Sequence, residues 1–145
     1  MSRGLRTDLP DGVFHVTTRG VDSCAIYRDD ADRWTFLGLL AECVERNAWV
    51  VHAYCLMMTH YHLVVEATQE QLSTGMHRLN GVHAIRFNRR YRRHGHLFGD
   101  RYASWVIEDE GYFEATVRYV LLNPVRAGLC ARPEDWPWSC QATAR

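Results

Sequence analysis

The chain has 145 residues, of which 47% are hydrophobic and 23% are charged, and its formal net charge is zero. These values are typical of one soluble globular domain over residues 1–145, and they exclude a disordered chain. No apolar stretch approaches the roughly 18 residues of a membrane-spanning helix, and the start has no apolar secretory segment. The five cysteines form no close CxxC pair. We therefore expect a cytoplasmic protein with reduced thiols.

Hydrophobic spacing and turn signals predict seven elements in chain order. They are a strand at 12–20, a helix at 29–47, strands at 49–58 and 60–67, a helix at 69–92, a strand at 95–109 with irregularities at its glycines, and a helix at 110–123. We expect the last helix to end near Asn123, because Pro124 disfavours helical geometry in the residue before it. The final residues, around Trp136 and Trp138, are expected to form an irregular wrap.

The first six elements follow the order β-α-β-β-α-β, which is the split pattern of ferredoxin-like and RRM-like domains. The predicted fold class is therefore α+β, with an antiparallel sheet that carries helices on one face. The open face of such a sheet is a common platform for single-stranded nucleic acid. The pattern alone does not decide the function, because this fold hosts many functions.

Two histidines one residue apart are the first candidate site residues. His60 and His62 flank Tyr61 in an apolar run, and strand geometry points both imidazoles to one face and Tyr61 to the other. Two imidazoles a few ångströms apart form half of a metal site. The alternative is a strand whose polar face happens to carry two histidines, because a His-x-His pair is a short motif.

The last predicted helix supplies two more candidates. Tyr119 and Asn123 are four residues apart and therefore share a helix face. Two imidazoles and one amide oxygen, completed by water, suit Mg²⁺ or Mn²⁺ better than structural zinc. A phenol beside such a cation can attack a polarised phosphodiester and form a phosphotyrosyl intermediate. The alternative for Tyr119 is a helix tyrosine that packs its ring and leaves its hydroxyl at the surface.

Positive charge gathers in one segment. Residues 77–101 contain seven arginines and one aspartate, and the segment RFNRRYRRH at 86–94 interleaves arginine with aromatic rings. This composition is expected where phosphates and unstacked bases are both contacted. The alternative is a solvated helix face, and a GC-rich genome would explain why all 17 basic residues are arginine. The nucleic-acid-binding candidates are Arg86, Arg89, Arg90, Tyr91, Arg92 and Arg93, together with Arg19 and Arg101 outside this run.

Six short segments, in order along the chain, resemble a known family. They are HVTTRG at 15–20, DDADRWTFLGLL at 29–40, CLMMTHYHLVV at 55–65, GHLFGDRY at 95–102, RYVLLNPVRAGL at 118–129 and PEDWPWS at 133–139. Together they resemble the REP-associated tyrosine transposases, which belong to the single-tyrosine HUH transposase superfamily. HYH is this chain's version of the histidine–hydrophobe–histidine motif of that superfamily.

The resemblance implies a metal-dependent endonuclease and strand transferase that acts on single-stranded DNA at hairpins of palindromic repeat elements. It implies that Tyr119 becomes joined to the 5′ phosphate and leaves a free 3′ hydroxyl, and that His60 and His62 hold Mg²⁺ or Mn²⁺. In related insertion-sequence enzymes the third ligand is a glutamine four residues after the tyrosine, a place that Asn123 occupies here. The resemblance leaves open whether the protein is a monomer or a homodimer, and it implies a nucleoid-associated protein.

Two other functions remain open from the sequence. One is a domesticated, non-cleaving binder of palindromic DNA hairpins, and the other is an RNA-binding domain of the same fold. The presence of the histidine pair and of Tyr119 favours the enzyme, because a pure binder gains nothing from them. Among the other tyrosines, Tyr61 is expected to pack behind the sheet, Tyr91 to stack on a base and Tyr112 to lie too far along its helix.

Overall fold

A five-stranded antiparallel sheet forms the centre of the computed structural model, which describes residues 12–142. The strand order is β4-β1-β3-β2-β5, and the β-α-β-β-α-β order and the α+β class predicted from the sequence are confirmed. The strands are β1 (Val13–Arg19), β2 (Val50–Leu56), β3 (His60–Glu66), β4 (Ala103–Ile107) and β5 (Ser139–Gln141), and the helices are α2 (Asp30–Asn47), α3 (Gln69–Arg90) and α4 (Glu110–Arg126), with short 3-10 turns η1 (Val21–Ser23) and η2 (Pro133–Asp135).

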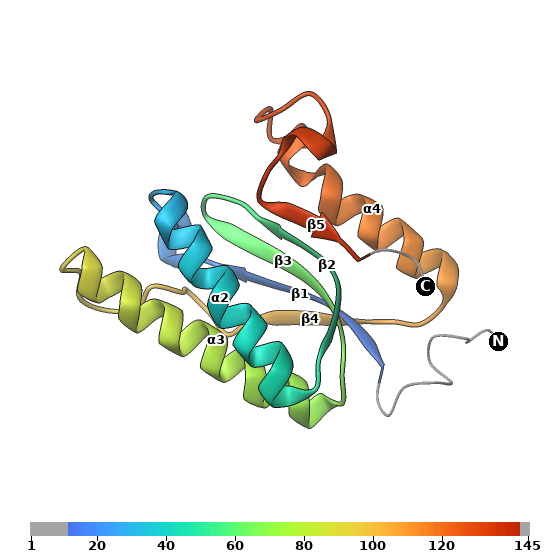
Figure 1. The fold of residues 1–145 in the computed structure, drawn as a ribbon, viewed down its shortest axis with the longest axis horizontal. Helices are drawn as coiled ribbons and strands as arrows, with labels where there is room; N and C mark the ends of the chain where they lie inside the picture. Colours follow the sequence, from blue (N-terminus) through green and yellow to red (C-terminus); the bar gives the residue numbers. More distant parts are fainter. Residues whose placement is uncertain (1–11, 143–145) are drawn as a thin grey trace.

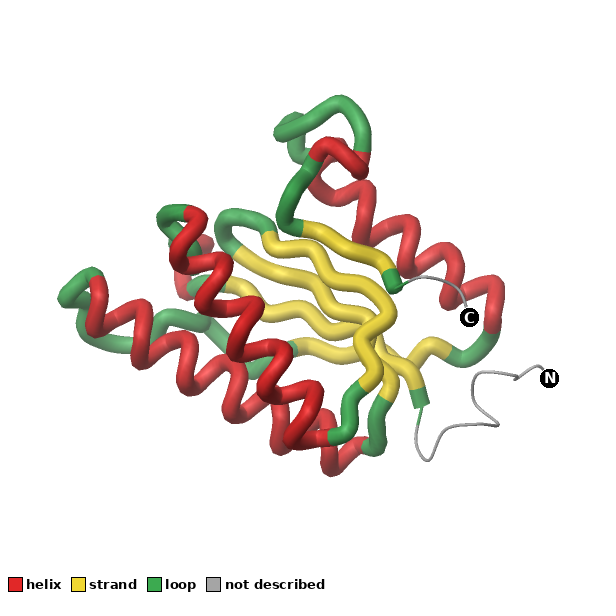
Figure 2. Tube along the Cα trace, viewed as in Figure 1, coloured by secondary structure: helices red, strands yellow, loops and turns green. Residues whose placement is uncertain are grey.

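Helices α2 and α3 cover one face of the sheet, as predicted. Figure 1 shows the two helices side by side along the strands, with α4 set apart from them, and Figure 2 shows the same layers by type of element. Phe14 and Leu63 from the strands and Phe36 and Leu79 from the helices are fully buried in the core between these layers. Each such side chain contributes about 1.5–3 kcal/mol through burial. This core fixes which residues of each strand face inward, and so which residues face the opposite side.

Each long helix begins at a side chain that accepts a hydrogen bond from its first turn. Asp29 accepts from the backbone N–H of Asp32 at 3.0 Å, and Asp109 accepts from that of Tyr112 at 2.8 Å. Thr68 forms a reciprocal capping box with Gln71 at the start of α3. Caps of this kind satisfy N–H groups that otherwise have no partner in the helix. They are also sequence signals, which is why the predicted starts at 29, 69 and 110 agree with the structure within one residue.

Helix α4 lies on the other face of the sheet. Its buried residues Val117 and Val120 belong to a second apolar cluster with Ala53 and Val64, which point away from the first core. Helix α4 packs on β2, β3 and β5, whereas Trp105 on the edge strand β4 is 47% exposed. The sheet face that is predicted to be open is therefore partly covered by α4. None of the helices between residues 12 and 142 combines the length and the apolar character needed to span a bilayer.

The end of α4 differs from the expectation. The helix does not end near Asn123 but continues through Pro124 to Arg126. Pro124 is buried on the same stripe as Val120, so its packing outweighs the local bias against helical geometry in the residue before it. The backbone N–H of Ala127 donates to the carbonyl of Asn123 at 3.0 Å and closes the last turn.

Two segments also differ from the predicted strands. Only Ala103–Ile107 of the segment 95–109 forms a strand, because Gly95 adopts a φ of +88° and the chain before β4 packs Leu97 into the core instead of extending. A single bridge between Gly20 and Phe98 connects this irregular loop to the end of β1. Within the predicted irregular wrap, Ser139–Gln141 pairs with β2 as a short edge strand.

A glycine at the contact between the two covering helices gives a test of this packing. A Cβ atom on Gly75 of α3 would lie 2.2 Å from a ring carbon of the buried Trp49, whereas a Cβ on the exposed Gly81 of the same helix would meet nothing within 4 Å. We expect Gly75→Ala to lower the free energy of unfolding by about 1–3 kcal/mol. Gly81→Ala should raise it by roughly 0.5–1 kcal/mol, because alanine is the better helix former. Urea unfolding of both variants checks this, and an unchanged Gly75→Ala protein would contradict the packing.

Candidate active site

The sheet register places the two predicted histidines at the start of β3, beside the end of β1. His60 pairs with Arg19 and His62 pairs with Thr17 on the neighbouring strand. The centroids of the two imidazole rings are 5.2 Å apart, on the face that carries α4. Tyr61 lies fully buried in the core on the opposite face, so the predicted alternation of these three side chains agrees with the structure.

A third imidazole joins this pair from β1. The Nε2 atom of His15 lies 3.0 Å from the Nδ1 atom of His62, and the two rings meet through these nitrogens, nearly parallel at 20° and with centroids 5.3 Å apart. The ring of Trp105 on β4 packs against His15 at a centroid distance of 5.2 Å. His15 therefore lies between the edge strand and the predicted metal ligand.

The two predicted ligands are neutral at physiological pH. Burial, followed by smaller contributions from His15, His60, Arg19 and Arg126, lowers the pKa of His62 to about 3. Burial, followed by the charge of Arg19, lowers the pKa of His60 to about 4. The Nε2 atom of His62 is buried and has no hydrogen-bond partner among the described residues. A neutral imidazole nitrogen with a free lone pair is the form that binds a metal ion.

Tyr119 lies on α4 next to these rings. Its ring centroid is 6.0 Å from that of His62 and 6.1 Å from that of His15, and the side chain is 48% exposed. Arg126, which lies seven residues further along α4, places its guanidinium 4.3 Å from the centroid of the Tyr119 ring. It also donates a hydrogen bond of 2.6 Å to the backbone carbonyl of Tyr119. The Tyr119 ring thus lies between the imidazoles and the Arg126 guanidinium and remains exposed to solvent.

The predicted third ligand is less closely connected to the histidines. Asn123 donates its side-chain N–H to the carbonyl of Tyr119 at 3.2 Å, and no contact among the described residues joins it to His60 or His62. Over residues 12–142, no cluster of three His, Cys, Asp or Glu side chains has a metal-binding arrangement. The histidine pair could supply two nitrogen ligands to a divalent cation, whose remaining ligands would have to be oxygen atoms from an amide, water or phosphate.

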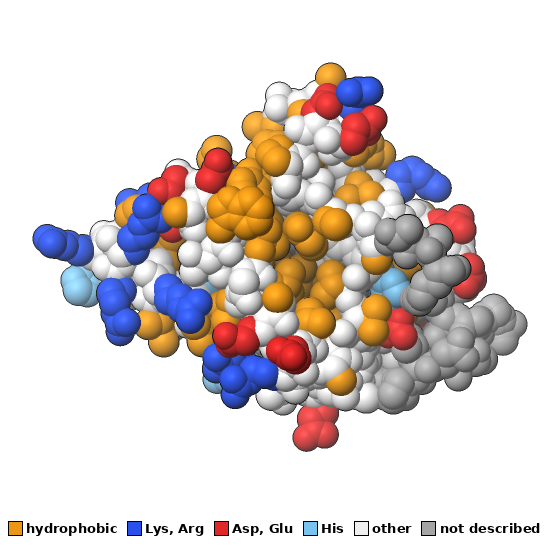
Figure 3. All heavy atoms as spheres, viewed as in Figure 1, with side chains coloured by type: hydrophobic (Ala, Val, Ile, Leu, Met, Phe, Trp, Pro, Cys, Tyr) orange, Lys and Arg blue, Asp and Glu red, His pale blue; other side chains and the backbone are white. Residues whose placement is uncertain are grey.

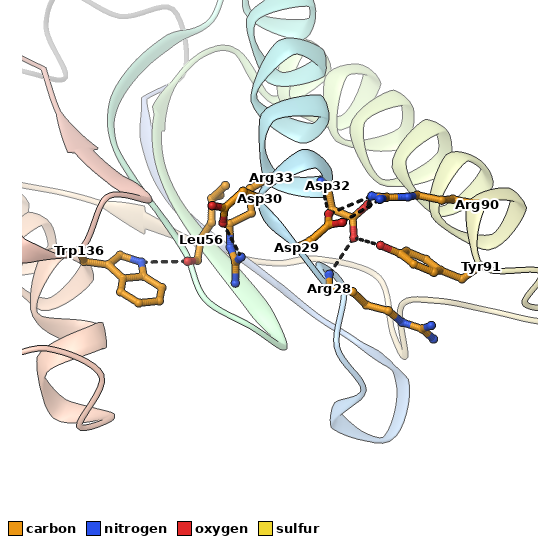
Figure 4. A network of polar contacts seen from close by, with 9 residues as sticks. All are labelled: Arg28, Asp29, Asp30, Asp32, Arg33, Leu56, Arg90, Tyr91 and Trp136. Atoms are coloured by element: carbon orange, nitrogen blue, oxygen red, sulfur yellow. Dashed lines mark hydrogen bonds and ion pairs between the residues drawn. The ribbon is translucent and has the colours of Figure 1, made fainter.

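Two residues predicted to bind nucleic acid have protein partners instead (Figure 4). Arg90 donates to Asp29 at 2.7 Å and to the buried Asp32 at 2.6 Å, and the hydroxyl of Tyr91 donates to Asp32 at 2.7 Å. The backbone N–H of Arg28 donates to the same carboxylate at 2.7 Å. A buried carboxylate requires such partners. Arg90 and Tyr91 therefore tie the end of α3 to the start of α2, a structural role that the sequence did not predict.

The other arginines divide by position. Arg93 donates to the side chain of Asn88 at 2.9 Å and to the carbonyl of His96, so it holds the loop after α3. Figure 3 shows most of the blue arginine side chains on this face over α2 and α3, on the side of the sheet away from His60 and His62. The predicted residues that are exposed and form no ion pair with other described residues are Arg19, Arg86, Arg89, Arg92 and Arg101.

Sequence reasoning missed three residues of the site: His15, Trp105 and Arg126. The alternation of β1 does place His15 on one face with Thr17, but only the pairing of β1 with β3 brings it to His62. Arg126 lies beyond the predicted end of the helix. The strand prediction for 95–109 does not fix the face on which Trp105 lies.

The fold and the site define a class of protein: an α+β domain that presents a histidine pair and a helix tyrosine on one sheet face. The chain belongs to the family of IS200-like transposases, whose family model matches residues 14–123. The resemblance to tyrosine transposases seen in the sequence is thereby confirmed at the level of the family, and the protein is a DNA-processing enzyme of the transposase type.

Two solved structures have the same fold. One is a REP-associated tyrosine transposase bound to a REP hairpin, with a TM-score of 0.73 at 14% identity, covering 88% of this chain and 75% of the other. The second is the crystal structure of a candidate transposase from Deinococcus radiodurans R1, with a TM-score of 0.54 at 18% identity, covering 77% of this chain and 88% of the other. At these identities the likeness concerns the fold. No curated protein matches the chain.

Proposed function

We propose that this protein is a metal-dependent endonuclease and strand transferase that acts on single-stranded DNA at hairpins, through a covalent 5′-phosphotyrosine at Tyr119. The observation that carries the proposal is the position of the Tyr119 ring, 6.0 Å from the ring of His62, whose buried Nε2 has no partner among the described residues. The family supports a transposase role, and the structural neighbour bound to a REP hairpin supports a hairpin substrate.

The proposed chemistry uses few groups of the chain. His60, His62 and Asn123 would hold Mg²⁺ or Mn²⁺, which when bound polarises the scissile phosphodiester. The oxygen of Tyr119 forms a bond to phosphorus while the bond between phosphorus and the 3′ oxygen breaks. The phenol loses its proton and the 3′ oxygen gains one. Because one phosphate ester bond replaces another, no external energy source is consumed. Attack of a 3′ hydroxyl on the phosphotyrosine reverses these bonds and completes strand transfer. Arg126 keeps Tyr119 in place through its contacts with the ring and the carbonyl.

The exposed groups beside the site suit a single strand. Trp105 offers a half-exposed ring on which a base can stack, next to His15. Arg19 is exposed at the end of β1, opposite His60, where it can contact a phosphate. Both lie on the part of the sheet face that α4 leaves uncovered.

Labelled oligonucleotides that carry a palindromic hairpin with single-stranded flanks test the function. We expect nicking of the single-stranded flank with Mn²⁺ or Mg²⁺, a free 3′ hydroxyl and a denaturation-resistant protein–DNA adduct, and we expect no product with EDTA or with the same sequence as a duplex. Hairpin binding without any cleavage would show a non-cleaving binder instead. Preference for an RNA hairpin of the same sequence would show an RNA-binding domain.

A salt titration separates the arginines that contact DNA from those that hold the fold. Replacing the exposed Arg89 and Arg92 by Gln should make the plot of log affinity against log salt shallower by up to about 1.4 units, at roughly 0.7 per phosphate contact on a single strand. Arg90→Gln should lower thermal stability and leave the slope unchanged, because Arg90 already pairs with Asp29 and Asp32. An unchanged slope in the Arg89/Arg92 variant would show that these arginines are only a solvated surface.

A further inference from the structure

We propose that His15 is a positioning residue: it accepts a hydrogen bond from the Nδ1–H of His62 and thereby leaves the lone pair of His62 Nε2 for the divalent cation. The part of this inference that concerns the cation rests on the proposed function. The hydrogen bond itself does not, and it can be tested without metal.

The geometry requires one proton between two imidazoles. His15 Nε2 and His62 Nδ1 are 3.0 Å apart, which is a normal hydrogen-bond distance. Two neutral rings share a single proton at such a contact, so one ring donates and the other accepts. If the shared proton belongs to His62 Nδ1, then His62 Nε2 is unprotonated. If it belongs to His15 Nε2, then His62 Nε2 carries a proton.

The remaining nitrogen of His62 distinguishes the two arrangements. If His15 donated, His62 would carry its proton on Nε2, which is buried and has no acceptor among the described residues. That N–H could not bind a cation. If His62 donates from Nδ1, its Nε2 keeps a lone pair that can bind the proposed cation. Histidines that bind metals commonly donate their other N–H to a fixed acceptor, and here the acceptor is an imidazole instead of a carboxylate.

Packing holds His15 in this role. Its ring lies nearly in line with the ring of His62, contacts Trp105 of β4 and lies at a steep angle to the Tyr119 ring at a centroid distance of 6.1 Å. It therefore touches both the ligand and the proposed nucleophile. His15 is not itself a ligand of the same cation, because its Nε2 faces the Nδ1–H of His62, and this N–H points in a different direction from the lone pair on His62 Nε2.

The first test is the tautomer of His62 in the metal-free wild-type protein at pH 7.5. Long-range ¹H–¹⁵N correlation spectra of the imidazoles should show His62 protonated on Nδ1 and bare on Nε2. In His15→Leu the acceptor is gone, and we expect His62 to move toward the Nε2-protonated form. A wild-type His62 that carries its proton on Nε2 would overturn the inference, whatever the variants do.

The second test uses substitutions of His15 that differ in side-chain length and in whether they offer a hydrogen-bond acceptor. A glutamine at position 15 can place its carbonyl oxygen near the site of the imidazole Nε2, whereas an asparagine is one methylene too short. Mn²⁺ affinity, measured by electron paramagnetic resonance, should fall by roughly 10–100-fold in His15→Leu and His15→Asn and by only a few-fold in His15→Gln. Equal losses in all three variants would show that His15 acts by packing alone.

A control variant removes another buried imidazole from the same face. His52 is 7% exposed, pairs with Glu66 at 2.6 Å and packs on Phe113 of α4. His52→Gln should lower stability without changing Mn²⁺ affinity or the tautomer of His62. A wild-type protein that shows the predicted tautomer but binds no Mn²⁺ would refute the metal-dependent function and leave the hydrogen-bond assignment standing.

Discussion

Replacing Tyr119 with phenylalanine is expected to abolish nicking and the denaturation-resistant adduct, with a cleavage rate lowered by roughly 10⁴-fold or more. The change removes one oxygen atom from a side chain that is 48% exposed. Stability should therefore stay within about 0.5 kcal/mol of the wild type, and hairpin affinity should be nearly unchanged. Single-turnover cleavage of a labelled hairpin oligonucleotide and denaturing gels measure the two losses.

Tyr112 provides the matched control for this substitution. It is 44% exposed on the same helix, seven residues and roughly 10 Å before Tyr119, and no ring contact joins it to the histidines among the described residues. Tyr112→Phe should cleave like the wild type. If Tyr119→Phe still formed the adduct, another residue would be the nucleophile.

Replacing His60 and His62 together by alanine is expected to abolish Mn²⁺ binding and to lower cleavage by about 10³-fold or more. The neutral rings of this pair, whose centroids are 5.2 Å apart, would supply the nitrogen ligands of the proposed cation. Mn²⁺ titration and the nicking assay measure both effects in the same protein. Circular dichroism shows whether the sheet is retained.

His52→Ala controls for the loss of a buried imidazole. His52 lies on the same face but pairs with Glu66, so this variant should lose stability and keep both Mn²⁺ binding and cleavage. Undiminished cleavage by the His60/His62 double variant would remove the metal site from the account.

The fold was predictable wherever local signals agree with packing. Alternation in 12–20 and in 60–67 gave the strands, and caps such as Asp29 and Thr68 gave the helix starts. The predictions were wrong where tertiary packing overrides a local preference. Pro124 continues α4 because it is buried on the helix stripe. The segment 95–102 is a loop because burial of Leu97 replaces strand pairing.

From the sequence, the site was predictable only where its residues lie close to one another along the chain. The spacing of His60, Tyr61 and His62 fixes their faces, which is why their placement agrees with the structure. His15 reaches His62 through strand pairing across 47 residues of sequence, which no local pattern reports. The pairing of Arg90 with the start of α2 is also remote in sequence, so the sequence could not show which arginines of the run are held by ion pairs and which are exposed without one.

The central claim is that Tyr119 becomes covalently joined to the 5′ phosphate of a cleaved DNA strand. The most direct measurement is to incubate the wild-type protein with Mn²⁺ and a single-stranded hairpin oligonucleotide, trap the adduct by denaturation, digest it and locate the modified residue by mass spectrometry. The account predicts a nucleotide attached through its 5′ phosphate to Tyr119 and to no other tyrosine. An adduct on a different residue, or cleavage that proceeds with no adduct, would contradict it.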